Sequence, residues 1–140
     1  MRGGCKTHPV PEQQADATLD QAAPVQSTYY TLLDTTKNAR IYSIMVLIQT
    51  TNETLQVKIT VDGEIWISTA TACVAATPNY YYKTGHVVQG SLVTAGAIPY
   101  LDGVVGFRYP LEGRSIKVEV QKTTVAGAGN LQGRVVYAKW

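Results

Sequence analysis

Residues 53–67 constrain the fold more than any other part of this sequence, because two alternating segments flank an Asp-Gly pair. In the first segment apolar residues recur at every second position, which is the period of a strand and not of a helix. Those residues are Leu55, Val57, Ile59 and Val61. Asp62 and Gly63 can take the positive φ angles of a type I′ turn, so the chain should reverse there and pair with residues 64–68. The sequence therefore predicts an antiparallel β-hairpin.

Further short strands separated by turn residues follow from residue 27 onward. Residues 40–49 leave almost no polar face, which is typical of a central strand covered on both sides. The other expected strands are 27–33, 80–82, 86–93, 104–109, 115–121 and 131–139, with an irregular strand and loop over 68–77. Strands recurring every roughly 8 to 12 residues are typical of a β-sandwich or barrel.

These strands predict an all-β fold, an antiparallel β-sandwich of eight to ten strands with a jelly-roll-like topology. The jelly roll is favoured because the long loops at 68–79 and 94–103 suit Greek-key crossings between two sheets. An immunoglobulin-like sandwich is the open alternative, although the Cys and Trp spacing of true immunoglobulin domains is absent.

Residues 1–26 differ in composition from the rest, and we expect them to form an extended or disordered N-terminal arm ahead of a sandwich domain at 27–140. Prolines lie among polar residues there, and too few apolar residues are present to close a core. A disordered tail and an arm that orders on a neighbouring subunit are both open, and a short helix over 11–19 is conceivable. The candidate partner-binding residues of the arm are Pro9, Val10, Pro11, Leu19, Pro24 and Val25.

The charge and hydropathy of the chain exclude two classes of partner. The formal charge of +2 comes from scattered residues without a basic block, so a nucleic-acid partner is not expected. No apolar run approaches the roughly 20 residues needed to span a bilayer, so a membrane partner is not expected either. A chain of 140 residues that is 45% hydrophobic is predicted to form one domain.

No constellation of residues in the sequence points to catalysis, a metal or a cofactor, and we expect no enzyme activity. His8 and His86 are the two histidines, and no Gly-x-Ser-x-Gly elbow accompanies either. Asp62 and Asp102 precede glycine, where turns favour Asp. Cys5 and Cys73 lack metal-site spacing; we expect a mobile and a buried thiol respectively, with a single bridge between them left open.

Aromatic residues are the other candidates for partner binding, because the chain holds nine tyrosines and Tyr is enriched at interfaces and sugar-binding surfaces. Tyr80 and Tyr82 are expected to share one strand face. Trp66 is expected on the polar face with Glu64, as a subunit contact, and Trp140 becomes a contact only where something covers it. A carbohydrate-binding β-sandwich module, for receptor or glycan adhesion, is the alternative that these aromatics keep open.

Three segments, 42–48, 55–63 and 114–120, together resemble a group of small all-β virion proteins, the decoration or fibre-associated accessory proteins of tailed bacteriophages. The pattern extends over most of residues 27–139 and carries no catalytic motif. The resemblance implies a non-enzymatic capsid decoration, cement or head-tail accessory protein on the outer surface of a virion. Its expected partners are sister copies in a homo-oligomer and the major capsid or tail protein.

Overall fold

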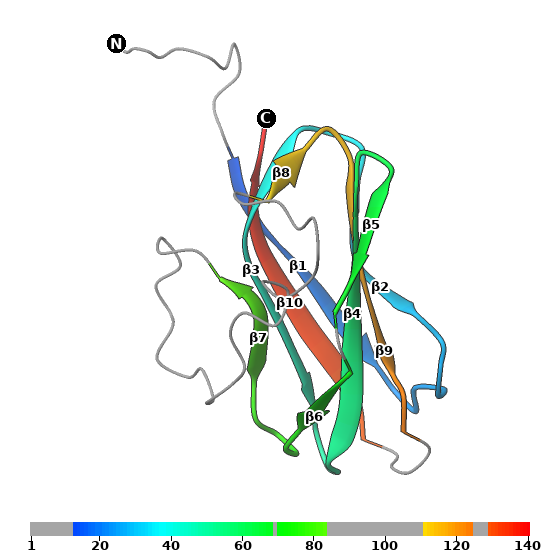
Figure 1. The fold of residues 1–140 in the computed structure, drawn as a ribbon. Coiled ribbons are helices and arrows are strands. Elements are labelled where there is room, and N and C mark those ends of the chain that lie inside the picture. Colours follow the sequence, from blue (N-terminus) through cyan, green and yellow to red (C-terminus); the bar gives the residue numbers. More distant parts are fainter. Residues whose placement is uncertain (1–12, 69, 84–110, 125–128) are drawn as a thin grey trace.

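The computed structural model describes residues 13–68, 70–83, 111–124 and 129–140. These residues form two antiparallel five-stranded sheets and no helix (Figure 1), which confirms the predicted all-β fold and antiparallel sandwich. Ten strands lie within the described ranges: β1 Gln13–Gln21, β2 Tyr30–Thr35, β3 Ala39–Ile48, β4 Glu53–Val61, β5 Glu64–Ile67, β6 Thr71–Cys73, β7 Asn79–Lys83, β8 Glu112–Gly113, β9 Ile116–Lys122 and β10 Leu131–Lys139.

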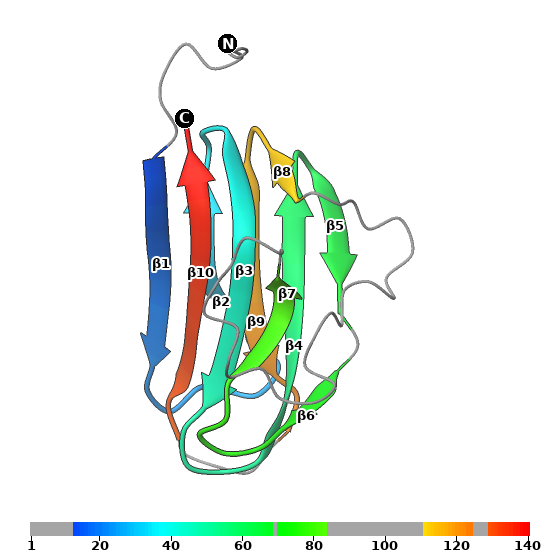
Figure 2. The ribbon, with the colours of Figure 1, turned by 90° about the vertical axis from the view of Figure 1, so that its left-hand side faces the viewer.

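The two sheets interleave early and late parts of the chain. One sheet has the order β1-β10-β3-β7 with β8 also paired to β3, and the other has the order β2-β9-β4-β5 with β6 also paired to β4. Figure 2 shows the first sheet facing the viewer, with β10 between β1 and β3. Each sheet therefore places a strand from the end of the chain between two strands from its beginning.

The core lies between the inner faces of the two sheets. In β4 the predicted alternation is present, since Leu55, Val57, Ile59 and Val61 are fully buried and the residues between them are half-buried. The turn after β4 also has the predicted geometry, with φ of 49° at Asp62 and 87° at Gly63. The β4–β5 hairpin predicted from the sequence is therefore confirmed.

Strand β3 is central in its sheet, lying between β10 and β7, but it is not covered equally on both sides. Ile41 and Ile44 are fully buried in the core, whereas Tyr42 and Met45 are half-buried. The nearly continuous apolar sequence predicted two covered faces. A register shift at Tyr42 interrupts the alternation, so the neighbouring residues Ser43 and Ile44 are both buried, while Tyr42 and Met45 are both half-buried.

The expectation for residues 1–26 is corrected over residues 13–21, which form β1, a full strand of the sandwich. β1 pairs antiparallel with β10 from Gln13 opposite Lys139 to Gln21 opposite Leu131. The helix considered over 11–19 is therefore wrong for the described part of that range. The physical reason is an alternation of apolar residues, two alanines and one leucine, that pack against the core, namely Ala15, Ala17 and Leu19.

Some sequence expectations fall outside the described residues. They include the strands expected at 86–93 and 104–109, the loop at 94–103, and residues 1–12 of the predicted arm. Apart from β1 and the two-residue strand β8, the strands in the described ranges were predicted to within a few residues, and β10 matches its predicted range.

Candidate interaction surface at the edge strand β5

The hairpin turn holds β5 in place at the edge of its sheet. One carboxylate oxygen of Asp62, Oδ1, accepts hydrogen bonds from the backbone N–H groups of Arg114, at 2.8 Å, and Ser115, at 2.9 Å. The backbone N–H of Asp62 also donates to the carbonyl of Ser115, at 3.0 Å. The turn that reverses the chain is thereby fixed to the loop before β9, and the start of β5 is fixed with it.

The side chains of β5 divide between the core and solvent in the opposite way to the one we predicted. Trp66 is only 6% exposed and belongs to the core, so the expectation of an exposed subunit contact is wrong. A two-residue turn places Trp66 opposite Ile59, and directly opposed residues lie on the same face of a sheet. Ile65 and Ile67 point outward instead, with 58% and 45% of their surface exposed.

The backbone of β5 also has one unpaired edge, because among the described residues β5 pairs only with β4. Residues in an antiparallel pair alternate between exchanging hydrogen bonds with the partner strand and pointing their N–H and C=O groups away from it. The N–H of Ser68 donates to the carbonyl of Val57 at 2.9 Å, which fixes the phase of that alternation. The backbone N–H and C=O groups of Ile65 and Ile67 therefore point away from β4, outward from the edge of the described sheet.

Charged residues of both signs lie beside the two isoleucines on the outer face of the sheet. Glu119 of β9 forms ion pairs with two lysines, with Lys58 Nζ at 3.6 Å and Lys117 Nζ at 3.8 Å from its carboxylate oxygens. The Lys58 ammonium also lies 4.4 Å from the centre of the Tyr29 ring. Burial, followed by the nearby Glu119 charge, raises the pKa of Tyr29, so this ring stays neutral beneath the ammonium. Lys58 is opposite Ile67 in the β4–β5 register, so the charged side chains on β9 and β4 are followed, at the edge strand β5, by an apolar one.

The sequence predicted that Tyr80 and Tyr82 share one face of the strand, but in the structure they lie on different faces. Tyr82 is opposite the core residue Ile44 and Tyr80 is opposite Met45, with a register shift between the two pairs. The extra residue, Tyr81, is fully buried and its hydroxyl donates to the carbonyl of Leu55 at 3.2 Å. Tyr82 is 1% exposed and Tyr80 is 8% exposed, so neither ring offers a binding platform.

The other predicted contact residues are dispersed. Leu19 packs against the core from β1, Pro24 is buried, and Val25 is 60% exposed in the loop between β1 and β2. The half-buried Trp140 lies under Arg40, whose guanidinium carbon is 5.7 Å from the ring centre. None of these residues joins the β5 edge. Pro9, Val10 and Pro11 lie outside the described residues.

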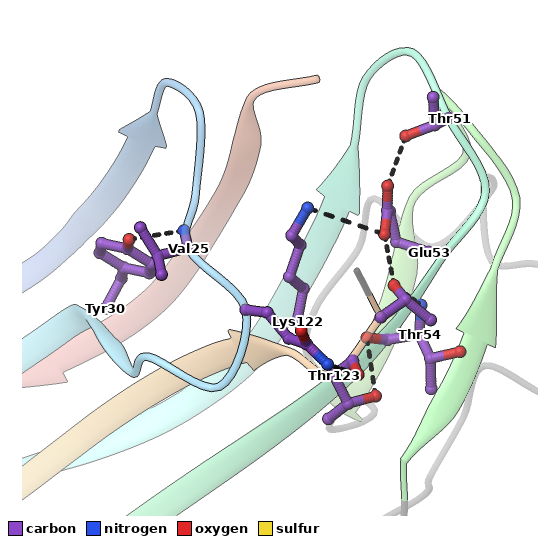
Figure 3. Close-up of polar contacts among 9 residues, drawn as sticks. Val25, Tyr30, Thr51, Glu53, Thr54, Lys122 and Thr123 are labelled. Atoms are coloured by element: carbon purple, nitrogen blue, oxygen red, sulfur yellow. Dashed lines mark hydrogen bonds and ion pairs between the residues drawn. The ribbon is translucent and has the colours of Figure 1, made fainter. Parts of the chain in front are cut away.

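A buried ion pair at the opposite end of the sandwich is a structural feature (Figure 3). Lys122 Nζ lies 3.9 Å from Glu53 Oε1, and both side chains are almost fully buried. The other Glu53 oxygen accepts from the Thr51 hydroxyl at 2.6 Å, and Oε1 also accepts from the Thr124 hydroxyl. These contacts satisfy the carboxylate, and they join the start of β4 to the end of β9.

Figure 3 also shows the loop before β2 held by the Val25 N–H, which donates to the Tyr30 hydroxyl at 2.9 Å.

Metal-binding side chains do not gather in the described part of the chain. No three His, Cys, Asp or Glu side chains lie together there as a metal site would require. Cys73 is a buried free thiol, and burial raises its pKa above the ordinary value of 9.0. No helix among the described residues is long and apolar enough to cross a membrane. His8, His86 and Cys5 lie outside these residues.

Comparisons with protein-family models, with curated proteins and with solved structures found no match for this chain. Ile65 and Ile67 were not among the contact residues predicted from the sequence, although one signal for them was present. With Asp62 and Gly63 as a two-residue turn, Ile65 and Ile67 must lie on the face of Lys58 and Thr60, which is the polar face of β4.

Proposed function

We propose that this protein is a non-enzymatic structural protein of a virion, a capsid decoration, cement or head-tail accessory protein on the particle surface. It binds sister copies and the major capsid or tail protein. The observation that carries this proposal is β5, an edge strand among the described residues, where Ile65 and Ile67 are exposed and their backbone groups point away from β4. Native sheets commonly protect such edges with charged residues, proline or bulges, and Glu64 is the one such feature in the four residues of β5.

The proposal includes a jelly-roll topology for the sandwich. Support comes from the strand order, in which β10 lies between β1 and β3 in one sheet and β9 lies between β2 and β4 in the other. Successive strands alternate between the sheets except along the β4–β5–β6 stretch and at the short strand β8. Two Greek keys in a double sheet are the architecture of many viral capsid proteins, as well as of lectins and cupins. The architecture supports a virion role by analogy.

The charge distribution is compatible with close association of copies. On the outer face beside β5, Lys58 and Lys117 share Glu119 as their partner, so one carboxylate offsets part of the positive charge that a neighbouring subunit meets. With such a surface, assembly depends mainly on buried apolar area and on strand pairing.

A carbohydrate-binding module is less well supported. Stacking on sugar rings requires exposed aromatic faces, whereas the large apolar side chains that are exposed among the described residues are aliphatic. They are Val25, Ile65, Ile67 and Val74.

The proposal is tested by locating the protein on particles. An antibody raised against the purified chain would be applied, with gold labelling, to virus particles purified from the organism that carries the gene. We expect gold on the outer surface of capsids or tails. Label found in cells while purified particles remain unlabelled would overturn the virion role.

A further inference from the structure

We infer that two copies of this chain associate by pairing their β5 strands antiparallel about a two-fold axis, with Ile65 of one copy opposite Ile67 of the other. This inference deepens the proposed function and rests on it for its biological setting. The two sheets that contain β4 and β5 would thereby join into one continuous sheet across the dimer. β5 is the edge at which the described order of that sheet ends.

The register follows from which backbone groups are available. Only Ile65 and Ile67 direct their N–H and C=O groups away from β4 within the four residues of β5. Pairing Ile65 with Ile67 of the second copy uses all of these groups at once, and the two-fold axis repeats the pair. A register centred on Ile65 or on Ile67 alone leaves one residue without its counterpart within β5.

The side chains agree with this register. The four isoleucines of the two copies would meet as one apolar seam on the outer face, flanked by Lys58 and Thr60 of each copy. Glu64, the one charged residue of β5, would lie opposite Ser68 of the second copy and not opposite another carboxylate. No like charges therefore oppose each other along the paired strands, which is the condition for stable cross-strand neighbours.

A second copy is favoured over an unrelated peptide because the edge is self-complementary. Isologous two-fold interfaces require that a surface patch match itself. The β5 strand meets this requirement, because the two-fold axis places Ile65 of one copy opposite Ile67 of the other. A four-residue strand also gives a separate peptide few backbone bonds, whereas a second copy adds side-chain contacts from the whole sheet.

The first experiment measures the mass of the full-length chain by light scattering over a range of concentrations. We expect a dimer that becomes a monomer in Ile65→Lys/Ile67→Lys, with an unchanged circular dichroism spectrum because both side chains are already exposed. The matched control is Val74→Lys, since Val74 is 60% exposed but lies outside β5, and it should remain dimeric. A wild-type monomer at every concentration, or a dimer unaffected by the two lysines, would overturn the inference.

The second experiment tests the register with disulfides in a Cys5→Ser background. Directly opposed residues in a hydrogen-bonded pair lie about 5.5 Å apart at Cα, within disulfide range. The same residue in the two copies would be offset by about 6.8 Å along the strand, which is too far. Co-expressed Ile65→Cys and Ile67→Cys chains should therefore form the mixed 65–67 disulfide in excess of either homodisulfide. Homodisulfides in excess would refute this register.

These outcomes are separable from the test of the proposed function. Particles that carry the label together with a chain that is monomeric, or dimeric through another surface, would preserve the virion role and remove the β5 interface. A β5 dimer without label on particles would do the reverse.

Discussion

At the scale of single residues, Asp62 links a turn to a strand that is distant in sequence. Its carboxylate accepts from the N–H groups of Arg114 and Ser115, and its own φ is positive. We expect Asp62→Ala to lower the free energy of unfolding by about 0.5–1.5 kcal/mol, because two exposed backbone N–H groups exchange the carboxylate for water. Asp62→Asn should lose less, since Asn tolerates the left-handed region and keeps an acceptor oxygen. Urea unfolding compares the two, and equal losses would contradict the role of the carboxylate oxygen.

The buried pair of Glu53 and Lys122 gives a second prediction for residues. Lys122→Met should lower the free energy of unfolding by about 3–5 kcal/mol, because it leaves Glu53 buried without its cation. The double variant Glu53→Gln/Lys122→Met should recover part of that loss, since no charge is then buried. Thermal or urea unfolding of both variants is the measurement. A double variant less stable than Lys122→Met would show that the pair itself does not account for the effect.

The thiol of Cys73 gives a prediction about pH. Its pKa is raised above the ordinary value of 9.0 mainly by burial, so the folded state keeps the thiol protonated when the unfolded state has lost its proton. A raised pKa contributes stability that is present below the unfolded value and is lost as pH rises through the folded value. The difference in free energy of unfolding between wild type and Cys73→Ala should therefore shrink above about pH 9. A difference that stays constant from pH 7 to 10.5 would exclude this linkage.

At the scale of elements, the sequence predicted strands whose inner positions hold large apolar residues. The β4–β5 hairpin and β10 are examples, because alternation and turn chemistry agree there. β1 was missed because its inner positions are occupied by two alanines and one leucine, too small a signal to stand out against its polar neighbours. The orientations of Tyr80 and Tyr82 could not be predicted, since a β-bulge between them depends on pairing with β3 and not on local sequence.

Truncation tests whether β1 belongs to the sandwich. Removing residues 1–21 should lower the midpoint of urea unfolding, because β10 loses its partner strand and Leu19 leaves the core. Removing residues 1–12 alone keeps β1 and should change the midpoint less. If the two truncated proteins were equally stable, the pairing of β1 with β10 would not stabilise the sandwich, and the prediction would be wrong.

At the scale of the whole molecule, the interaction surface was less predictable than the fold. Sequence reasoning placed the contacts on aromatics and on the first 26 residues, whereas Trp66 and Tyr82 are in the core. The exposure of Ile65 and Ile67 was not predicted, because residues 65–67 are all apolar. Their exposure follows from the register of the β4–β5 hairpin and from the place of β5 at the edge of the described sheet. The proposed assembly therefore depends on whether the β5 edges of two molecules pair with each other.

The most direct measurement is amide hydrogen exchange at β5 by NMR, at concentrations below and above the dissociation constant found by light scattering. The N–H groups of Ile65 and Ile67 point away from β4, so their exchange should slow strongly as the protein associates. The N–H of Trp66, which faces β4, should change little and is the internal control. Association that leaves the exchange of Ile65 and Ile67 unchanged would contradict the claim that this protein assembles through its β5 edge.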